Sequence, residues 1–219
     1  MSLRPGSRLI LALDETDPVK AMAVARQTAP MLAAIKVNWP LVLTASAQVI
    51  EDLSRLAPVI CDFKVADIPN TNRLIVEEAC RRGAEGVIVH AFTGSDSVKA
   101  AVQAARGKSI FVVTEMSHPG GAEFTALHGD RFASMASENG AAGIIAPATR
   151  PERIAALRKI IGNLLILSPG VGAQGGSATA ALRMGADYVI VGRSIYEAAD
   201  PRRAAQMLDE EIRAFLDSS

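Results

Sequence analysis

The sequence predicts a single-domain (β/α)8 barrel, an α/β fold also called the TIM barrel. Eight short apolar segments recur along its 219 residues, and most of them are followed by a stretch with helical spacing. The segments are apolar throughout, as parallel strands covered on both faces are. Polar residues follow their ends, whereas their starts are mostly apolar or small, which indicates that reactive groups gather at one mouth of the barrel. The count of eight favours a closed barrel over an open doubly wound sheet.

The first half of the chain supplies four strand-helix units. We expect strands at 8–14, 33–37, 58–63 and 86–90, and helices at 18–31, about 45–56, 69–82 and about 95–105. Pro69 suits the first turn of a helix, and Gly83 suits the position that ends it.

The second half supplies four more units. We expect strands at 109–114, 143–146, 164–168 and 187–192, and helices at about 130–139, from Pro151, at 177–184 and at about 201–216. The fifth strand is followed by a longer connection that contains Ser117, His118 and Pro119. No linker or low-complexity stretch divides the chain, so we expect one domain over 1–219 with its core at about 8–216.

The charge balance excludes some classes of partner. With 23 basic and 23 acidic residues, the chain has no net field that would favour nucleic acid or an anionic membrane. No apolar stretch approaches the roughly 20 residues of a membrane-spanning helix, and residues 1–6 lack the apolar core of a signal peptide. We therefore expect a cytoplasmic protein. Cys61 and Cys80 have no metal-site spacing and are expected to be buried thiols.

A cluster of charges ends the third strand. Asp62 and Lys64 share a face if the strand continues through them, and Asp67 follows in the turn before Pro69. An ammonium group among carboxylates in an apolar setting is a candidate for proton chemistry. A structural network of ion pairs at a strand end is the alternative.

The loops after strands seven and eight indicate a site for an anion. Glycines there let backbone N–H groups approach an anion, a helix beginning at Ser194 would direct its positive end at it, and Arg193 adds a bidentate partner. These loops are the usual phosphate site of the fold, so we expect a phosphorylated substrate, although the glycines could also serve tight turns alone. The loop at 169–179 is expected to close over the phosphate. The candidate residues are Pro169, Gly170, Val171, Gly172, Gln174, Gly192 and Arg193.

The histidines do not suggest a metal site. His118 precedes Pro119 and Gly120 and is expected to be a loop residue rather than a catalytic base, since nothing in the sequence pairs with it. His90 is expected at the barrel mouth and His128 on the surface. Asp62 and Asp67 could bind Mg²⁺, but Lys64 between them supplies the opposite charge. We expect neither a metal nor a cofactor.

These motifs occur together in one order, and they resemble the orotidine 5′-phosphate decarboxylase family in its compact archaeal form. The resemblance runs from Leu9 to the last helix and is carried by Lys36, Asp62-x-Lys64-x-x-Asp67-Ile68-Pro69-x-Thr71, Thr114 to Gly120, Ser168 to Gly172, and Val191 to Ser194. It implies metal-free decarboxylation of orotidine 5′-monophosphate to UMP in pyrimidine biosynthesis, by a homodimer whose sites lie at the interface.

The resemblance also implies a role for each matching residue. Lys64 protonates C6 of the pyrimidine, Asp62 lies beside the departing carboxylate, and Lys36 and Asp14 hold the ribose hydroxyls and the charge network. Ser117 recognises the pyrimidine, while Gln174, Gly192 and Arg193 belong to the phosphate end. The residues implied to reach into the partner's site are Asp67, Ile68 and Thr71.

Two other functions remain open at this point. A metal-dependent relative, a keto-gulonate-phosphate decarboxylase or a hexulose-phosphate synthase, shares the Asp-x-Lys-x-x-Asp motif but has a carboxylate where this chain has Lys36. A barrel that binds a nucleotide phosphate without catalysis is the second alternative, and the intact charged cluster argues against it.

Overall fold

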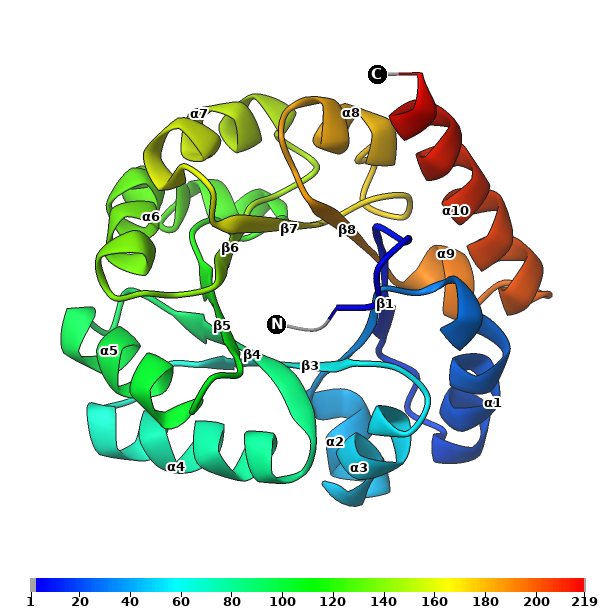
Figure 1. Cartoon of the computed structure of the whole chain (residues 1–219), viewed down its shortest axis with the longest axis horizontal. Helices are drawn as coiled ribbons and strands as arrows, with labels where there is room; N and C mark the ends of the chain where they lie inside the picture. The colour runs from blue at the N-terminus through cyan, green and yellow to red at the C-terminus, as the bar shows by residue number, and fades with distance from the viewer. Residues whose placement is uncertain (1–2, 219) are drawn as a thin grey trace.

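A computed structural model describes residues 3–218 as a closed barrel of eight parallel strands, so the predicted fold is confirmed. Neighbours in the sequence pair in order, and β1 closes the barrel by pairing with β8 (Figure 1). The strands are β1 (Leu9–Leu13), β2 (Ala34–Val37), β3 (Val59–Val65), β4 (Ala84–His90), β5 (Ser109–Val113), β6 (Gly143–Ile145), β7 (Leu165–Pro169) and β8 (Tyr188–Val191).

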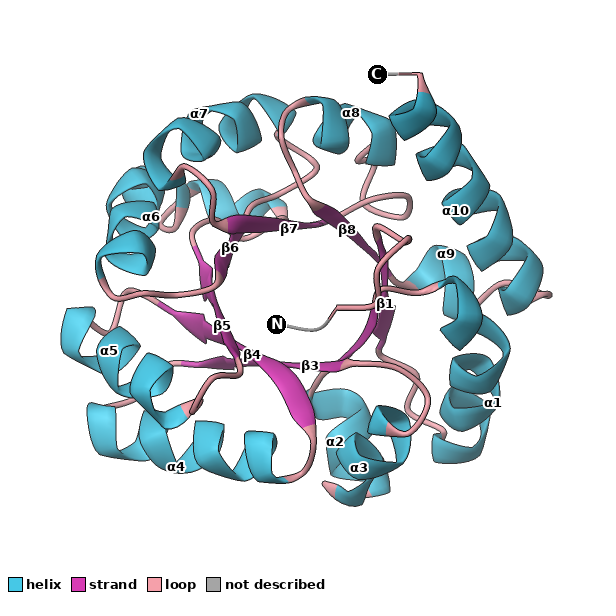
Figure 2. Ribbon diagram, in the orientation of Figure 1, coloured by secondary structure: helices cyan, strands magenta, loops and turns pink. Residues whose placement is uncertain are grey.

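Helices surround the barrel on its outside (Figure 2). They are α1 (Pro18–Thr28), α2 (Trp39–Ala45), α3 (Gln48–Ser54), α4 (Pro69–Arg81), α5 (Ser95–Ala104), α6 (Gly129–Glu138), α7 (Pro151–Ile161), α8 (Ala178–Arg183), α9 (Arg193–Tyr196) and α10 (Pro201–Asp217), with 3-10 turns at Ala29–Met31, Pro119–Ala122 and Ala126–His128. Within residues 3–218, none of these helices is both long and apolar enough to cross a membrane.

Local sequence explains where several helices begin and end. Asp17 caps α1 by accepting hydrogen bonds from the N–H groups of Val19 and Lys20, and proline lies in the first turn of α1, α4, α7 and α10. Gly83 adopts a φ of +95° just after α4, which confirms it as the residue that ends this helix.

Two apolar layers hold the fold together. The larger lies between the strands and the helices, and the smaller fills the inside of the barrel. Phe111 is fully buried in the inner layer, where Gly86 on the neighbouring strand leaves room for its ring: a Cβ at Gly86 would lie 2.9 Å from it. The inner layer comprises Ile10, Ala12, Ala33, Ala34, Ile60, Ile88, Phe111, Val113, Ile145, Leu167 and Ile190.

The N-terminal segment covers the end of the barrel where the strands begin. Leu3 packs against the inner layer, and the backbone N–H of Arg4 donates to the carbonyl of Ala33 at 3.0 Å. The Arg4 guanidinium also donates to the carbonyls of Ala29 and Leu56. This end is closed, and the mouth at the strand C-termini stays free for a site.

The region after β2 differs from the prediction. A helix at about 45–56 was expected, and α3 lies within that range; a further short helix, α2, precedes it and was not expected. Asn38 caps α2, Pro40 lies in its first turn, and Ser46 ends it with a φ of +64°. The helical pattern that begins at Trp39 was missed because it spans only about two turns.

Candidate active site

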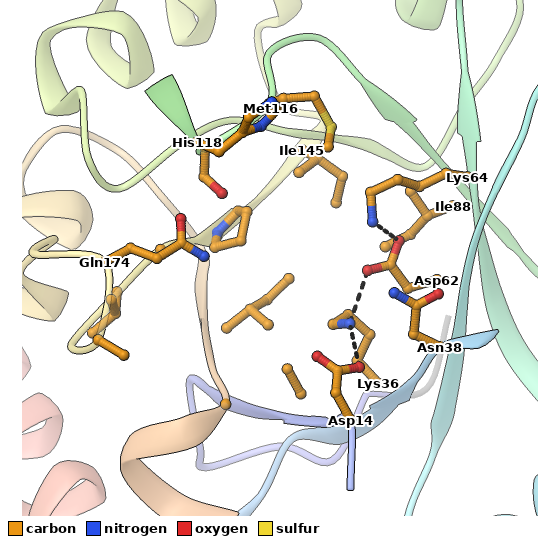
Figure 3. A pocket seen from close by; sticks show the side chains of 18 of the residues that line it. Asp14, Lys36, Asn38, Asp62, Lys64, Ile88, Met116, His118, Ile145 and Gln174 are labelled. Carbon is orange, nitrogen blue, oxygen red and sulfur yellow. Dashed lines mark hydrogen bonds and ion pairs between the residues drawn. The ribbon is translucent and has the colours of Figure 1, made fainter. Parts of the chain in front are cut away.

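A cavity of about 310 Å³ opens at the C-terminal ends of the strands (Figure 3). Its apolar lining belongs to the inner layer of the barrel, so a ligand there would contact a packed apolar surface. The residues that line it are Ala12, Asp14, Lys36, Asn38, Asp62, Lys64, Ile88, Val113, Glu115, Met116, Ser117, His118, Ile145, Pro169, Gly170, Val171, Ala173, Gln174, Ile190, Gly192, Arg193 and Tyr196.

Four charged side chains form an alternating row along one wall of the cavity. Lys36 Nζ lies 3.7 Å from Asp14 Oδ1 and 2.8 Å from Asp62 Oδ2. Lys64 Nζ donates to the other oxygen, Asp62 Oδ1, at 2.8 Å. Each carboxylate oxygen of Asp62 therefore faces its own ammonium group, as Figure 3 shows. The expected contact between Asp62 and Lys64 is confirmed.

Burial and charge oppose one another in this row. Burial alone would lower the pKa of Lys36, but the carboxylates of Asp62 and Asp14 outweigh it, and the pKa is raised. Burial would likewise raise the pKa of Asp62, but Lys36 and Lys64 outweigh it, and this pKa is lowered. Lys36 thus stays cationic and Asp62 anionic at neutral pH, although both are over 90% buried.

The strand that carries Asp62 and Lys64 is not regular. On β3, Cys61 pairs with Val87 and Val65 pairs with Val89, so three residues intervene on β3 where only one does on β4. This β-bulge includes Lys64, which has a φ of +44°. Strand alternation alone, as assumed from the sequence, does not explain the direction of Lys64; the bulge sets it.

Asp67, Ile68 and Thr71 do not line the cavity of their own chain. Asp67 and Ile68 are exposed, Ile68 to 64%, and Thr71 is half-buried at the start of α4. The backbone at Asp67 is nevertheless fixed, because its N–H donates to Asn72 Oδ1 and its carbonyl accepts from Ser97 Oγ, each at 2.9 Å. The side chains of these two partners are almost completely buried.

The residues predicted for an anion meet at the other end of the cavity. Pro169, Gly170, Val171, Gln174, Gly192 and Arg193 all line it. In Figure 3, Gln174 lies across the cavity from Asp62 and Lys64. Gly172 is the exception: it lies just behind the lining, has a φ of +74°, and a Cβ there would lie 2.4 Å from Ser194 Oγ. The single turn of α9 begins at Arg193, one residue before the expected start.

The loop after β5 brings Ser117 and His118 to the cavity. Thr149 Oγ1 donates to the carbonyl of Ser117 at 3.0 Å, and Arg150 Nη2 donates to that of Met116 at 2.6 Å. Glu115 is fully buried and accepts from Arg153 Nε at 2.6 Å. This charged support was missed from the sequence, because Arg150 and Arg153 look like ordinary surface residues at the start of a helix.

The histidines lie close to where they were expected. His90 is at the mouth, half-buried, with its ring centroid 4.8 Å from that of Phe92, and burial together with Lys64 lowers its pKa to about 4. His128 is exposed, and His118 is a loop residue that lines the cavity. Within residues 3–218, no group of three or more His, Cys, Asp or Glu side chains is arranged to hold a metal ion.

The apolar part of the lining was also missed. Ile88, Val113, Ile145 and Ile190 are strand residues that point into the barrel and reach its mouth. Their position, as inward-facing residues near strand ends, was the available signal. The sequence contains no comparable pattern that would have predicted Asn38 and Tyr196, which follow β2 and β8 and also line the cavity.

Comparisons with known proteins agree over nearly the whole chain. Residues 7–208 match the Orotidine 5'-phosphate decarboxylase / HUMPS family. Over 211 residues the chain is 55% identical to orotidine 5'-phosphate decarboxylase of Methanosarcina mazei, covering 95% of this chain and 96% of that protein. The orotidine 5'-phosphate decarboxylase of Thermococcus kodakarensis is 51% identical over 209 residues, with 94% and 97% covered.

Solved structures give the same result. The orotidine 5'-monophosphate decarboxylase of Methanocaldococcus jannaschii, complexed with the inhibitor BMP, superposes with a TM-score of 0.90 at 40% identity, covering 94% of this chain and 98% of that one. The UMP synthase of Leishmania donovani superposes with a TM-score of 0.86 at 28% identity, and 95% of this chain matches 54% of that larger one.

Proposed function

Since the chain belongs to the orotidine 5'-phosphate decarboxylase / HUMPS family, we propose that it converts orotidine 5′-monophosphate to UMP and carbon dioxide. Relatives that are more than half identical and match nearly the full length carry the name of this carboxy-lyase. The observation that carries the proposal is the alternating row of Asp14, Lys36, Asp62 and Lys64 beside an apolar cavity.

The row suits a reaction that develops negative charge on carbon. When the carboxylate leaves, its bonding electron pair stays on C6 of the pyrimidine and carbon dioxide is released. Lys64 supplies a fixed positive charge there and transfers a proton from Nζ to C6, after which solvent reprotonates the amine. The contact of Lys64 with Asp62 supports this role, because the carboxylate holds the ammonium group in place beside the cavity. No step requires a metal.

Asp62 and Lys36 have different tasks in this proposal. Asp62 lies beside the departing carboxylate, where its negative charge disfavours the bound acid relative to neutral carbon dioxide. Lys36, with Asp14, binds the ribose hydroxyls and holds Asp62 from its other side. Lys36 also separates this chain from metal-dependent relatives, which place a carboxylate at the end of the second strand.

The opposite end of the cavity binds the phosphate, and the base lies between the two ends with its C6 towards Lys64. Arg193 and the backbone N–H of Gly192 contact the phosphate, Gln174 approaches it from the loop after β7, and Ser117 contacts the pyrimidine. The loop at 169–179 closes over the ligand, which excludes water and strengthens the charges inside.

The active unit is a homodimer in which Asp67, Ile68 and Thr71 complete the partner's site. Their place outside their own cavity supports this arrangement, as do large exposed apolar side chains after three adjacent strands. Trp39 follows β2, Ile68 follows β3 and Phe92 follows β4, with 42%, 64% and 59% of their surfaces exposed. Apolar side chains gathered in this way are typical of an interface.

The test is the loss of orotidylate absorbance with and without EDTA. We expect turnover that chelation does not change. Chelator-sensitive turnover of a sugar phosphate would instead indicate the metal-dependent relatives, and nucleotide binding without turnover would indicate a binding protein.

A further inference from the structure

Strand β3 continues beyond its neighbour β2. The last pair between them joins Val37 to Cys61, after which β2 ends and β3 runs on to Val65. On the other side the pairing with β4 is interrupted over the same residues. The segment that presents Asp62 and Lys64 therefore lacks regular strand pairing on both sides.

This segment also contains an unfavourable backbone conformation. Lys64 has a φ of +44°, in the left-handed region that residues with a side chain adopt only at an energetic cost. Such a conformation persists only where surrounding contacts impose it. The question is which contact does so at the end of β3.

Trp39 contacts the peptide group that joins Phe63 to Lys64. Its indole Nε1–H donates to the carbonyl of Phe63 at 3.1 Å, on the side of β3 where β2 has ended. Its ring also stacks on the Phe63 ring, with the centroids 4.3 Å apart and the planes inclined by 23°. Trp39 thus supplies the hydrogen bond that a longer β2 would have made.

We infer that Trp39 is a positioning residue for the decarboxylation, which holds the bulge of β3 so that Lys64 points at the reacting carbon. The inference rests on the proposed function. Trp39 itself does not line the cavity, and it is 42% exposed, so it acts through Phe63 and the Lys64 backbone rather than on substrate.

Two variants separate the hydrogen bond from the stacking. Trp39→Phe keeps an aromatic ring against Phe63 but has no N–H donor, and Trp39→Leu loses both contacts. Leu43→Ala is the matched control, because Leu43 lies one turn further along α2 and is 78% exposed. For each variant, kcat and KM for orotidylate, the sedimentation coefficient and the thermal midpoint are measured.

We expect Trp39→Phe to lower kcat about three- to tenfold, the range for one lost hydrogen bond, with KM within twofold of the wild type. Trp39→Leu should lower kcat further, and Leu43→Ala should leave both constants unchanged. A kcat for Trp39→Phe equal to that of Leu43→Ala would overturn the inference. A loss of activity that follows dissociation of the dimer would overturn it too, because the effect would then be on assembly.

A crystal structure of Trp39→Phe supplies a readout that does not depend on activity. We expect the φ of Lys64 to leave the left-handed region and the distance from its Nζ to Asp62 Oδ1 to exceed 2.8 Å. An unchanged Lys64 would contradict the inference even if the enzyme were active. If the wild type itself did not decarboxylate orotidylate, the proposed function would fail, whereas this structural result would still stand.

Discussion

At the scale of single residues, Asp62 is the centre of the site. It forms ion pairs with Lys36 and Lys64, and the shifted pKa values of Asp62 and Lys36 keep these two groups charged on both sides of neutral pH. Because its pKa is lowered in the folded protein, its stabilising effect is complete above its ordinary pKa and is lost as the pH falls. Because the pKa of Lys36 is raised, its effect is lost only as the pH rises beyond the ordinary lysine range.

His90 provides a test of electrostatics at the same mouth. Its pKa is lowered from 6.5 to about 4 by burial and by Lys64, with Asp62 acting in the opposite direction. The unfolded chain therefore takes up a proton more readily than the folded one, and stability should fall as the pH drops from 6.5 to about 4. His90→Gln should make the thermal midpoint less dependent on pH over this interval.

The control for His90 is His128→Gln, since His128 is exposed and does not line the cavity. Differential scanning calorimetry at half-unit steps of pH measures the slope for each protein. Equal slopes for the wild type and His90→Gln would show that His90 does not resist protonation in the folded state.

The identity of the charged residues could be predicted, but not how they are held. Asp62 and Lys64 are two apart in an apolar strand, and this spacing was enough to place them together. The positive φ of Lys64 could not be predicted, since no glycine or asparagine marks it. The same is true of Ser46, whose φ of +64° ends α2.

At the scale of elements, the turn between β3 and α4 depends on two buried side chains. The peptide of Asp67 donates to Asn72 at the start of α4 and accepts from Ser97 at the start of α5. Asn72 Nδ2 is itself buried without a hydrogen-bond partner in the described residues. Two buried polar side chains, Asn72 and Ser97, thus fix one backbone segment. This indicates that the function requires a defined position of Asp67.

Asn72→Ala should therefore destabilise the protein by about 1–3 kcal/mol, because it leaves the partly buried N–H of Asp67 without its acceptor. Ser97→Ala should have a smaller effect on stability, since a carbonyl tolerates a lost donor better. Both variants should also lower kcat/KM about tenfold. We expect each to displace Asp67 and so to remove one hydrogen bond in the transition state.

Exposed neighbours of the same residue types serve as controls for this pair. Asn70 lies on α4 and accepts a hydrogen bond from Arg73, and Ser95 lies on α5 and accepts one from Asn139, so the controls are Asn70→Ala and Ser95→Ala. Urea unfolding and steady-state kinetics on the four variants give the comparison. Wild-type kcat/KM in stable Asn72→Ala and Ser97→Ala proteins would show that Asp67 needs no such support.

At the scale of the whole molecule, the barrel could be predicted because the same pattern, an apolar strand with polar residues after its end, recurs eight times along the sequence. Eight apolar strands, their order and the mouth that carries polar residues all follow from one pattern, and single errors such as the missed α2 do not change the count. The assembly could not be predicted in this way. Nothing in the periodicity of one chain says whether Asp67 serves its own cavity, and only the resemblance implied a second subunit.

The proposed shared site leads to a prediction that only a dimer can satisfy. Lys64 lines the cavity of its own chain, whereas Asp67 lies outside it. In the proposed arrangement, Lys64→Ala removes the proton donor from one site and Asp67→Ala removes a carboxylate from the partner's site, so each variant alone should be nearly inactive. In a mixed dimer, one site then carries both defects and the other carries neither.

After full exchange of equal amounts, about half of the dimers are mixed, and activity should return to roughly a quarter of the wild-type level. A tag on one chain confirms the exchange; activity that stays at the level of the separate variants would place Asp67 in its own subunit's site.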